Sequence, residues 1–114
     1  MPSYTVSKLD PETQLVCFQG RITFGWETEN CRQKMKDLLT QGTKGFIFDL
    51  EKVEYVDSAG IGFLVSCLIT LRQGGARLKL ASPPERIRHV LEITRLDTIF
   101  QVCESREEAQ RAST

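Results

Sequence analysis

The chain has 114 residues, of which 40% are hydrophobic and 26% charged, and its 15 Lys+Arg balance its 15 Asp+Glu. This length and composition predict one domain over residues 1–114 and exclude a disordered chain, while zero net charge argues against nucleic-acid binding, which needs a clustered basic excess. No apolar run reaches the ~20 residues of a membrane-spanning helix and no signal peptide is visible, so we expect a cytoplasmic protein without membrane insertion.

The first two elements are predicted to be short strands that form an antiparallel hairpin. Residues 4–8 alternate weakly between apolar and polar side chains, and residues 15–18 are continuously apolar before Gly20. Between them, the sequence Asp-Pro-Glu-Thr at 10–13 favours a turn, because proline presets the backbone angle that a turn requires.

A helix and a buried strand are predicted next. From about residue 26 to 41 the side chains of Cys31, Met35 and Leu38 fall on one helical face, and Gly42 is expected to end the helix. Residues 46–48 are continuously apolar, which is typical of a strand covered on both faces. We expect that strand to end at Asp49 and to open into a polar loop over residues 50–57.

The second half of the chain alternates helices with strands. The patterns predict a helix over 58–73, a strand at 77–80 with one wetter face, a helix capped by Ser82, a strand at 99–103 and a terminal helix begun at Ser105. The inward stripe of the first of these helices is predicted to be Ile61, Leu64, Val65, Leu68 and Leu71. The order β-β-α-β-α-β-α-β-α predicts an α/β fold, or a mixed-sheet α+β variant, with about five mostly parallel strands and about four helices.

Residues 55–62 join the predicted loop to a helix start, the region of a parallel sheet where ligands and partners bind. Either Asp57 or Ser58 is expected to cap this helix. Gly60 and Gly62 each cost up to ~1 kcal/mol relative to alanine inside a helix. That cost indicates either crowding against the sheet or the close approach of a partner.

No enzyme motif is complete in this sequence. A dinucleotide fingerprint would need glycine or alanine where Val65 stands, the Gly-Thr-Lys-Gly run at 42–45 lacks P-loop spacing, and Ser58 is not within G-x-S-x-G. His89 falls within a predicted helix, and the four cysteines, expected to be reduced with three in the core, are far apart, so no zinc site is expected. We therefore expect no enzyme, no metal and no cofactor. The carboxylates before the second helix are expected to form a solvated acidic group: Asp49, Glu51, Glu54 and Asp57.

The sequence Asp57-Ser58-Ala59-Gly60-Ile61-Gly62 resembles the D-S-x-G-[LI]-G signature of STAS domains, the anti-sigma factor antagonist family. The strand and loop at 46–56, the Gly-Gly-Ala-Arg-Leu-Lys-Leu run at 74–80 and the terminal helix at 106–109 are similar to the same family. The resemblance extends over residues 4–109 and implies the STAS fold.

The resemblance also implies a non-catalytic switch. In the family, an anti-sigma factor that is itself a serine kinase with a GHKL-type ATPase fold phosphorylates the serine after the aspartate. The unphosphorylated antagonist binds this kinase and releases a sigma factor, which controls transcription, and a serine phosphatase restores it. Carried over to this chain, Ser58 is the phosphoacceptor and Asp57 its acidic neighbour.

A phosphate at the start of a helix suggests how such a switch would work. It would add about −1.5 to −2 charge at Ser58, where the helix dipole favours an anion, so the helix should not melt. We expect the phosphate to act by repulsion and desolvation at an interface, reinforced by Asp57 and Glu54.

The helix after Ser58 has a second apolar fringe. Phe63, Cys67 and Ile69 lie partly off the predicted inward stripe. Together with Ala59 they are candidates for a partner-facing patch, unless neighbouring helices cover both sides of this helix.

One position departs from the family pattern. Many members carry G-x-[LI]-D after the second strand, with that aspartate near the phosphoserine site, whereas this chain has Gly20-Arg21-Ile22-Thr23. Thr23 offers a hydroxyl in place of the second carboxylate.

The alternative function is a STAS-type scaffold or assembly subunit, as in a sensory or lipid-transport complex, that is not phosphorylated. A third possible function is that of a small-nucleotide-binding module, which no phosphate-cradling loop in the sequence supports. The sequence does not indicate the oligomeric state.

Overall fold

The computed structural model describes residues 4–23 and 25–111. Within them, the elements follow in the order β1 (Tyr4–Asp10), β2 (Thr13–Ile22), α1 (Trp26–Thr40), β3 (Gly45–Val56), α2 (Ser58–Gln73), β4 (Arg77–Ala81), α3 (Glu85–Ile93), the 3-10 helix η1 (Leu96–Thr98), β5 (Gln101–Cys103) and α4 (Arg106–Arg111). The predicted order of strands and helices is confirmed, with η1 as an addition.

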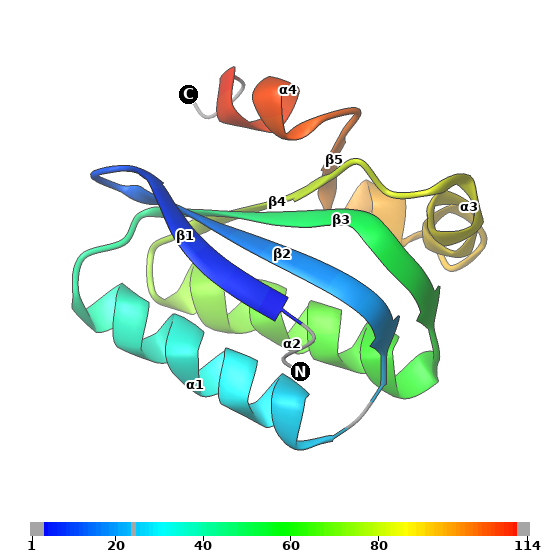
Figure 1. Cartoon of the computed structure of the whole chain (residues 1–114), viewed down its shortest axis with the longest axis horizontal. Helices are drawn as coiled ribbons and strands as arrows, with labels where there is room; N and C mark the ends of the chain where they lie inside the picture. Colours follow the sequence, from blue (N-terminus) through cyan, green and yellow to red (C-terminus); the bar gives the residue numbers. More distant parts are fainter. Residues whose placement is uncertain (1–3, 24, 112–114) are drawn as a thin grey trace.

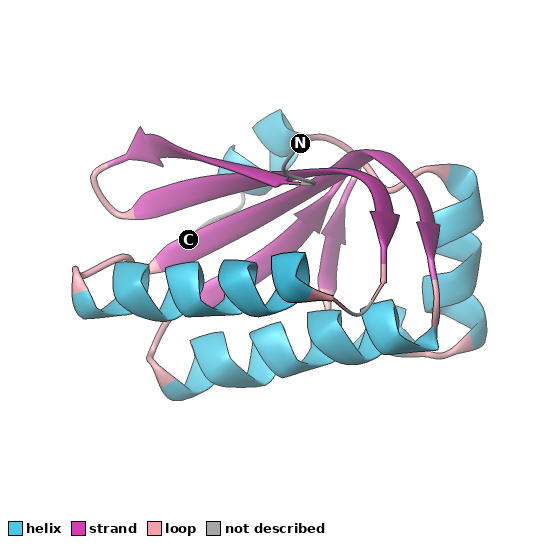
Figure 2. Cartoon of the chain, turned by 60° about the horizontal axis from the view of Figure 1, so that its bottom comes forward, coloured by secondary structure: helices cyan, strands magenta, loops and turns pink. Residues whose placement is uncertain are grey.

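The strands form one mixed sheet in the order β1-β2-β3-β4-β5. β1 and β2 form the predicted antiparallel hairpin, and the neighbouring pairs from β2 to β5 are parallel. Figure 1 shows α1 and α2 beneath the sheet and α4 on the opposite face, and Figure 2 shows α1 and α2 side by side. The main core lies between the sheet and these two helices, where Cys31, Met35 and Leu38 of α1 are buried as predicted.

The loop predicted over residues 50–57 is wrong, because β3 continues to Val56. Its second half pairs with the end of β2, after a register shift between the Cys17–Asp49 pair and the Gln19–Lys52 pair. A second shift follows between the Gly20–Val53 pair and the Arg21–Tyr55 pair, and each shift places an extra residue in β3. The buried apolar side chains of this half therefore follow at intervals of three: Leu50, Val53 and Val56. A strict two-residue alternation is therefore absent from the sequence, and the segment has the pattern of a loop.

Two further predictions about the second half are corrected. Ser82 does not cap a helix: α3 begins at Glu85, while Ser82 has a left-handed φ of 56° and its hydroxyl donates a hydrogen bond to the Glu104 carbonyl at 3.3 Å. The wetter face predicted for β4 is also wrong, since Lys79 is buried beneath α4. The Ser105 cap is confirmed, because its hydroxyl accepts a hydrogen bond from the Glu108 N–H at 3.0 Å.

An ion pair fastens α4 to the sheet. The Arg106 guanidinium donates hydrogen bonds to one carboxylate oxygen of Asp49, at 3.0 Å from Nε and 2.7 Å from Nη2. Asp49 is 4% exposed and therefore does not belong to a solvated acidic group beside Ser58, which corrects that prediction. A small apolar cluster lies near this ion pair: Leu15, Ile47, Ala81, Cys103 and Ala109.

Candidate functional site

The candidate site is the turn where β3 passes into α2. Asp57 is the N-cap of α2, with an extended backbone, and its carboxylate accepts a hydrogen bond from the Gly60 N–H at 2.7 Å. An aspartate is well suited to this position because its side chain satisfies a backbone donor that the helix cannot. Of the two candidate caps, Asp57 is therefore the one that caps the helix, and Ser58 does not.

Ser58 and Ala59, the first two residues of α2, are both exposed. Among the described residues, no side chain or backbone group forms a hydrogen bond with the Ser58 hydroxyl, so this oxygen faces solvent without a competing partner. It also lies at the amino end of a 16-residue helix, where unsatisfied N–H groups and the helix dipole stabilise negative charge.

The two glycines that follow serve different purposes. A Cβ added at Gly60 would lie 2.0 Å from the Ile22 carbonyl oxygen and 2.9 Å from Val56 Cγ1, so this position must be glycine for α2 to approach the end of β2. A Cβ added at Gly62 would have no atom within 4 Å. Packing against the sheet therefore explains Gly60 and leaves Gly62 as bare, exposed helix backbone close to Ser58.

Thr23 follows Ile22 directly and is half-buried. Since the Ile22 carbonyl approaches Gly60, Thr23 lies at the same edge of the molecule as the start of α2. The structure thus brings Asp57, Ser58, Gly60 and the end of β2 together, and Thr23 is adjacent to them.

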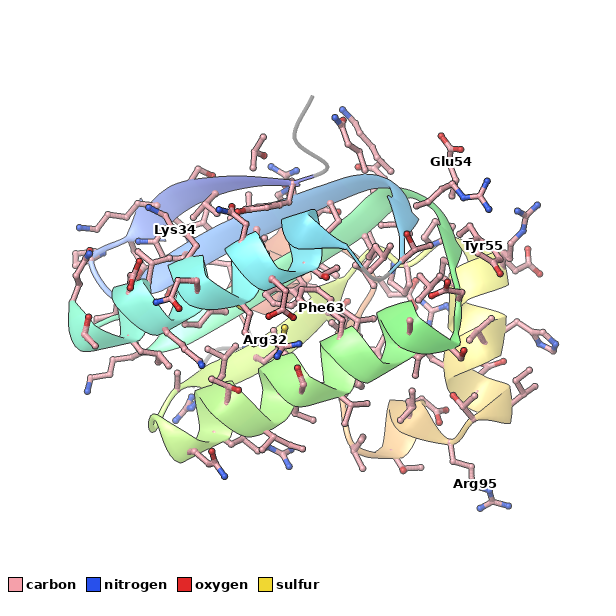
Figure 3. The ribbon with its side chains drawn as sticks, turned by 90° about the horizontal axis from the view of Figure 1, so that it is seen from below. Arg32, Lys34, Glu54, Tyr55, Phe63 and Arg95 are labelled. Atoms are coloured by element: carbon pink, nitrogen blue, oxygen red, sulfur yellow. The ribbon has the colours of Figure 1, made fainter. Side chains whose placement is uncertain are left out.

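Two residues predicted for a partner-facing patch are buried instead. Phe63, labelled in Figure 3, is 4% exposed, and Cys67 is fully buried. The Phe63 ring meets the Phe18 ring edge to face, with centroids 6.2 Å apart. Burial raises the pKa of the Cys67 thiol, which keeps it protonated and unreactive at neutral pH. The buried residues of α2 are Gly60, Phe63, Leu64, Cys67, Leu68 and Leu71.

The predicted inward stripe was therefore rotated by part of a turn, with Ile61 and Val65 at its half-buried margin. The physical reason is that α2 is apolar on nearly all sides, so spacing alone does not identify the face against the sheet. From the predicted patch, Ala59 is exposed, and Ile69 is 51% exposed further along the helix.

Cations that the sequence does not reveal lie beside the acidic residues. The Arg21 guanidinium lies 4.9 Å from the centroid of the Tyr55 ring, a cation–π contact, and Arg86 of α3 donates a hydrogen bond to the Glu54 carbonyl at 3.3 Å. Figure 3 shows Glu54 and Tyr55 near the start of α2. The surface before Ser58 is thus mixed in charge, because these cations come from β2 and α3, which are distant in the sequence.

Potential metal ligands do not gather in the described part of the chain. His89 is exposed on α3, and no three His, Cys, Asp or Glu side chains among the described residues gather to hold a metal ion. No helix in those same ranges is both long and apolar enough to cross a membrane. The arrangement at the turn consists of an exposed hydroxyl at a helix terminus, which can accept a modification and contact a partner.

The capping role of Asp57 leads to a stability prediction. Replacing Asp57 by alanine is expected to lower the free energy of unfolding by about 1 kcal/mol, because the Gly60 N–H loses its acceptor. Asp57→Asn is the matched control, since its amide oxygen still caps the helix, and it should lose clearly less. Urea unfolding of the three proteins measures the difference, and equal losses in both variants would show that the cap is not the cause.

Comparison with known proteins agrees with this geometry. The family model for the STAS domain matches residues 7–109. The Bordetella bronchiseptica protein BtrV, whose name assigns it provisionally to the anti-sigma factor antagonists, is 32% identical over 111 residues, covering 95% of this chain and 91% of BtrV. The anti-sigma-B factor antagonist of Staphylococcus aureus is 33% identical over 78 residues, covering 65% of this chain and 72% of that protein.

Solved structures share the fold at lower identity. The anti-sigma factor antagonist SpoIIAA in its unphosphorylated form matches with a TM-score of 0.77 and 21% identity, covering 95% of this chain and 94% of SpoIIAA. The phosphorylated form of SpoIIAA, from Bacillus, matches with a TM-score of 0.73 and 21% identity, covering 95% of this chain and 97% of SpoIIAA.

Proposed function

Because the chain belongs to the STAS domain family, among the anti-sigma factor antagonists, we propose that it binds an anti-sigma factor serine kinase and is switched off by phosphorylation of Ser58. In this proposal the unphosphorylated form sequesters the kinase in the cytoplasm, which releases a sigma factor, and a serine phosphatase reverses the modification. The protein acts by binding and has no catalytic activity of its own.

The observation that carries the proposal is the division of roles between Asp57 and Ser58. Asp57 holds the first turn of α2 through the Gly60 N–H, so the neighbouring hydroxyl is exposed and takes no part in the fold. A kinase can reach this oxygen without unfolding the helix. Gly62, with open space on its outer side, allows a partner backbone to approach the same turn closely.

The position of Ser58 also favours a switch that leaves the fold intact. A phosphate there would be stabilised by the amino end of α2, while it would add charge beside Asp57 and Glu54 at the surface that a partner contacts. The phosphorylated and unphosphorylated structures of SpoIIAA have the same fold as this chain, which supports modification without refolding.

Phosphotransfer to Ser58 is the experiment that tests this function. The protein is incubated with ATP and an anti-sigma factor kinase encoded beside it, and the phosphorylated residue is identified by mass spectrometry. We expect one phosphate on Ser58, none in Ser58→Ala, and normal transfer to Ser7→Ala, in which an exposed serine on β1 is removed. Transfer to another residue, or undiminished transfer to Ser58→Ala, would contradict the proposal.

The alternative function is a STAS scaffold that binds a partner without being phosphorylated. Thr23 is the observation that favours it, because a hydroxyl replaces the acid that many family members carry at the edge next to Ser58. Kinase binding without phosphotransfer in the same assay would support the scaffold and exclude the switch.

A further inference from the structure

A second candidate site lies at the opposite end of β3 from Ser58. A cavity of about 580 Å³ lies where β3 and β4 begin, bordered by the β1–β2 turn and by Ala109 of α4. In Figure 1 this is the left end of the sheet, whereas α2 starts at the right end. Such a volume is sufficient for a small ligand.

A buried ammonium group lines this cavity. Lys79 is 3% exposed, and its Nζ donates a hydrogen bond to the Ala109 carbonyl at 2.9 Å. A lysine ammonium has three donors, and in the described part of the chain no carboxylate forms an ion pair with Lys79. Burial lowers the pKa of this lysine, because desolvation disfavours the protonated form and no carboxylate among the described residues pairs with it.

Further positive charge surrounds Lys79. Arg77 lies two positions earlier on β4 and therefore on the same face of the sheet, close enough that its charge also lowers the pKa of Lys79. The Lys44 carbonyl accepts a hydrogen bond from the Arg77 N–H at 2.9 Å, which brings a third cationic residue to the cavity. An anion placed among them would relieve this repulsion.

The carboxylates at the cavity do not neutralise Lys79. Asp10 accepts a hydrogen bond from the Glu12 N–H at 2.9 Å, so its carboxylate stabilises the hairpin turn, and Glu12 is exposed at the tip of that turn. The Asp10 carboxylate also accepts hydrogen bonds from the backbone and side chain of Thr13, so its acceptor oxygens are used within the hairpin.

We infer that this cavity binds the phosphate or carboxylate group of a small molecule, held by Lys79 with Arg77 and Lys44. The inference is independent of the proposed function, because it uses the beginning of the parallel strands and not the turn that carries Ser58. Charge-assisted hydrogen bonds from the buried ammonium of Lys79 and from the exposed side chains of Arg77 and Lys44 supply the affinity.

A titration with inorganic phosphate tests the site. In isotope-labelled protein we expect saturable shifts of the amide signals of Thr13, Gly45 and Arg77, with those of Ser58 and Gly62 unchanged. Affinity should fall about tenfold in Lys79→Met and about threefold in Lys44→Gln, while Lys34→Gln on α1 is the charge-matched control and should bind normally.

Each outcome of this titration decides the question. Non-saturable shifts, or an equal loss in Lys34→Gln, would overturn the site as non-specific charge attraction. Lys79→Met also removes the hydrogen bond to the Ala109 carbonyl and can therefore disturb α4. Lys44→Gln avoids this problem, because Lys44 is exposed and its substitution leaves α4 in place. Acetate is titrated in parallel: tighter binding of phosphate identifies a phosphate group, tighter binding of acetate a carboxylate, and binding of neither overturns the inference.

Discussion

Replacing Gly60 by alanine is expected to lower the free energy of unfolding by about 3 kcal/mol, because the added Cβ would lie 2.0 Å from the Ile22 carbonyl oxygen. Neither side of this contact can move aside cheaply. Ile22 is paired with Val56 in the sheet, and α2 is fixed by the Asp57 cap and by its buried face. Urea unfolding, with circular dichroism as the signal, measures the loss.

Gly62→Ala is the matched control for this prediction, since the same substitution is made two residues further along the same helix. It meets no neighbouring atom, and alanine is the better helix former, so we expect a gain of up to ~1 kcal/mol. If the partner approaches this bare backbone, the same variant will bind the kinase more weakly despite its greater stability. Equal destabilisation of both variants would contradict the close packing described for Gly60.

Phosphorylation of Ser58 is expected to weaken kinase binding by about a hundredfold, which corresponds to about 2.7 kcal/mol. The phosphate adds about −1.5 to −2 charge beside Asp57 and Glu54, and both its repulsion and its desolvation oppose an interface that covers the start of α2. The amino end of the helix stabilises the same phosphate in the free protein, so α2 should remain folded.

Ser58→Asp separates the charge effect from unfolding. It adds a single negative charge, so we expect a smaller loss of about tenfold in kinase affinity, with the helical circular dichroism of the unmodified protein. Ser58→Ala should bind the kinase normally, because the hydroxyl forms no hydrogen bond among the described residues and the fold therefore loses none. A loss of helix signal in Ser58→Asp would contradict a switch confined to the surface.

The sequence predicts the element order and the helix over 58–73 correctly because glycines and polar residues mark the ends of these elements. The same residues place Ser58 at the start of a helix. The sequence does not predict the length of β3, because two register shifts, between Asp49 and Lys52 and between Val53 and Tyr55, remove the regular alternation. Nor does it predict which face of α2 is buried, because that helix is apolar on most sides.

The sequence also does not predict contacts between residues that are far apart along the chain. The Arg21–Tyr55 contact, the Arg86 hydrogen bond to Glu54 and the Asp49–Arg106 ion pair depend on how strands and helices pack. They change the predicted acidic surroundings of Ser58 into a mixed surface. The two glycines of the signature likewise have the same propensity cost, and only the packing of α2 against β2 distinguishes Gly60 from Gly62.

Calorimetric titration of the kinase with the same protein, before and after stoichiometric phosphorylation of Ser58, tests the central claim most directly. We predict strong binding before phosphorylation and binding weaker by about a hundredfold afterwards, with an unchanged fold. Equal affinity for the two forms would contradict Ser58 as the switch.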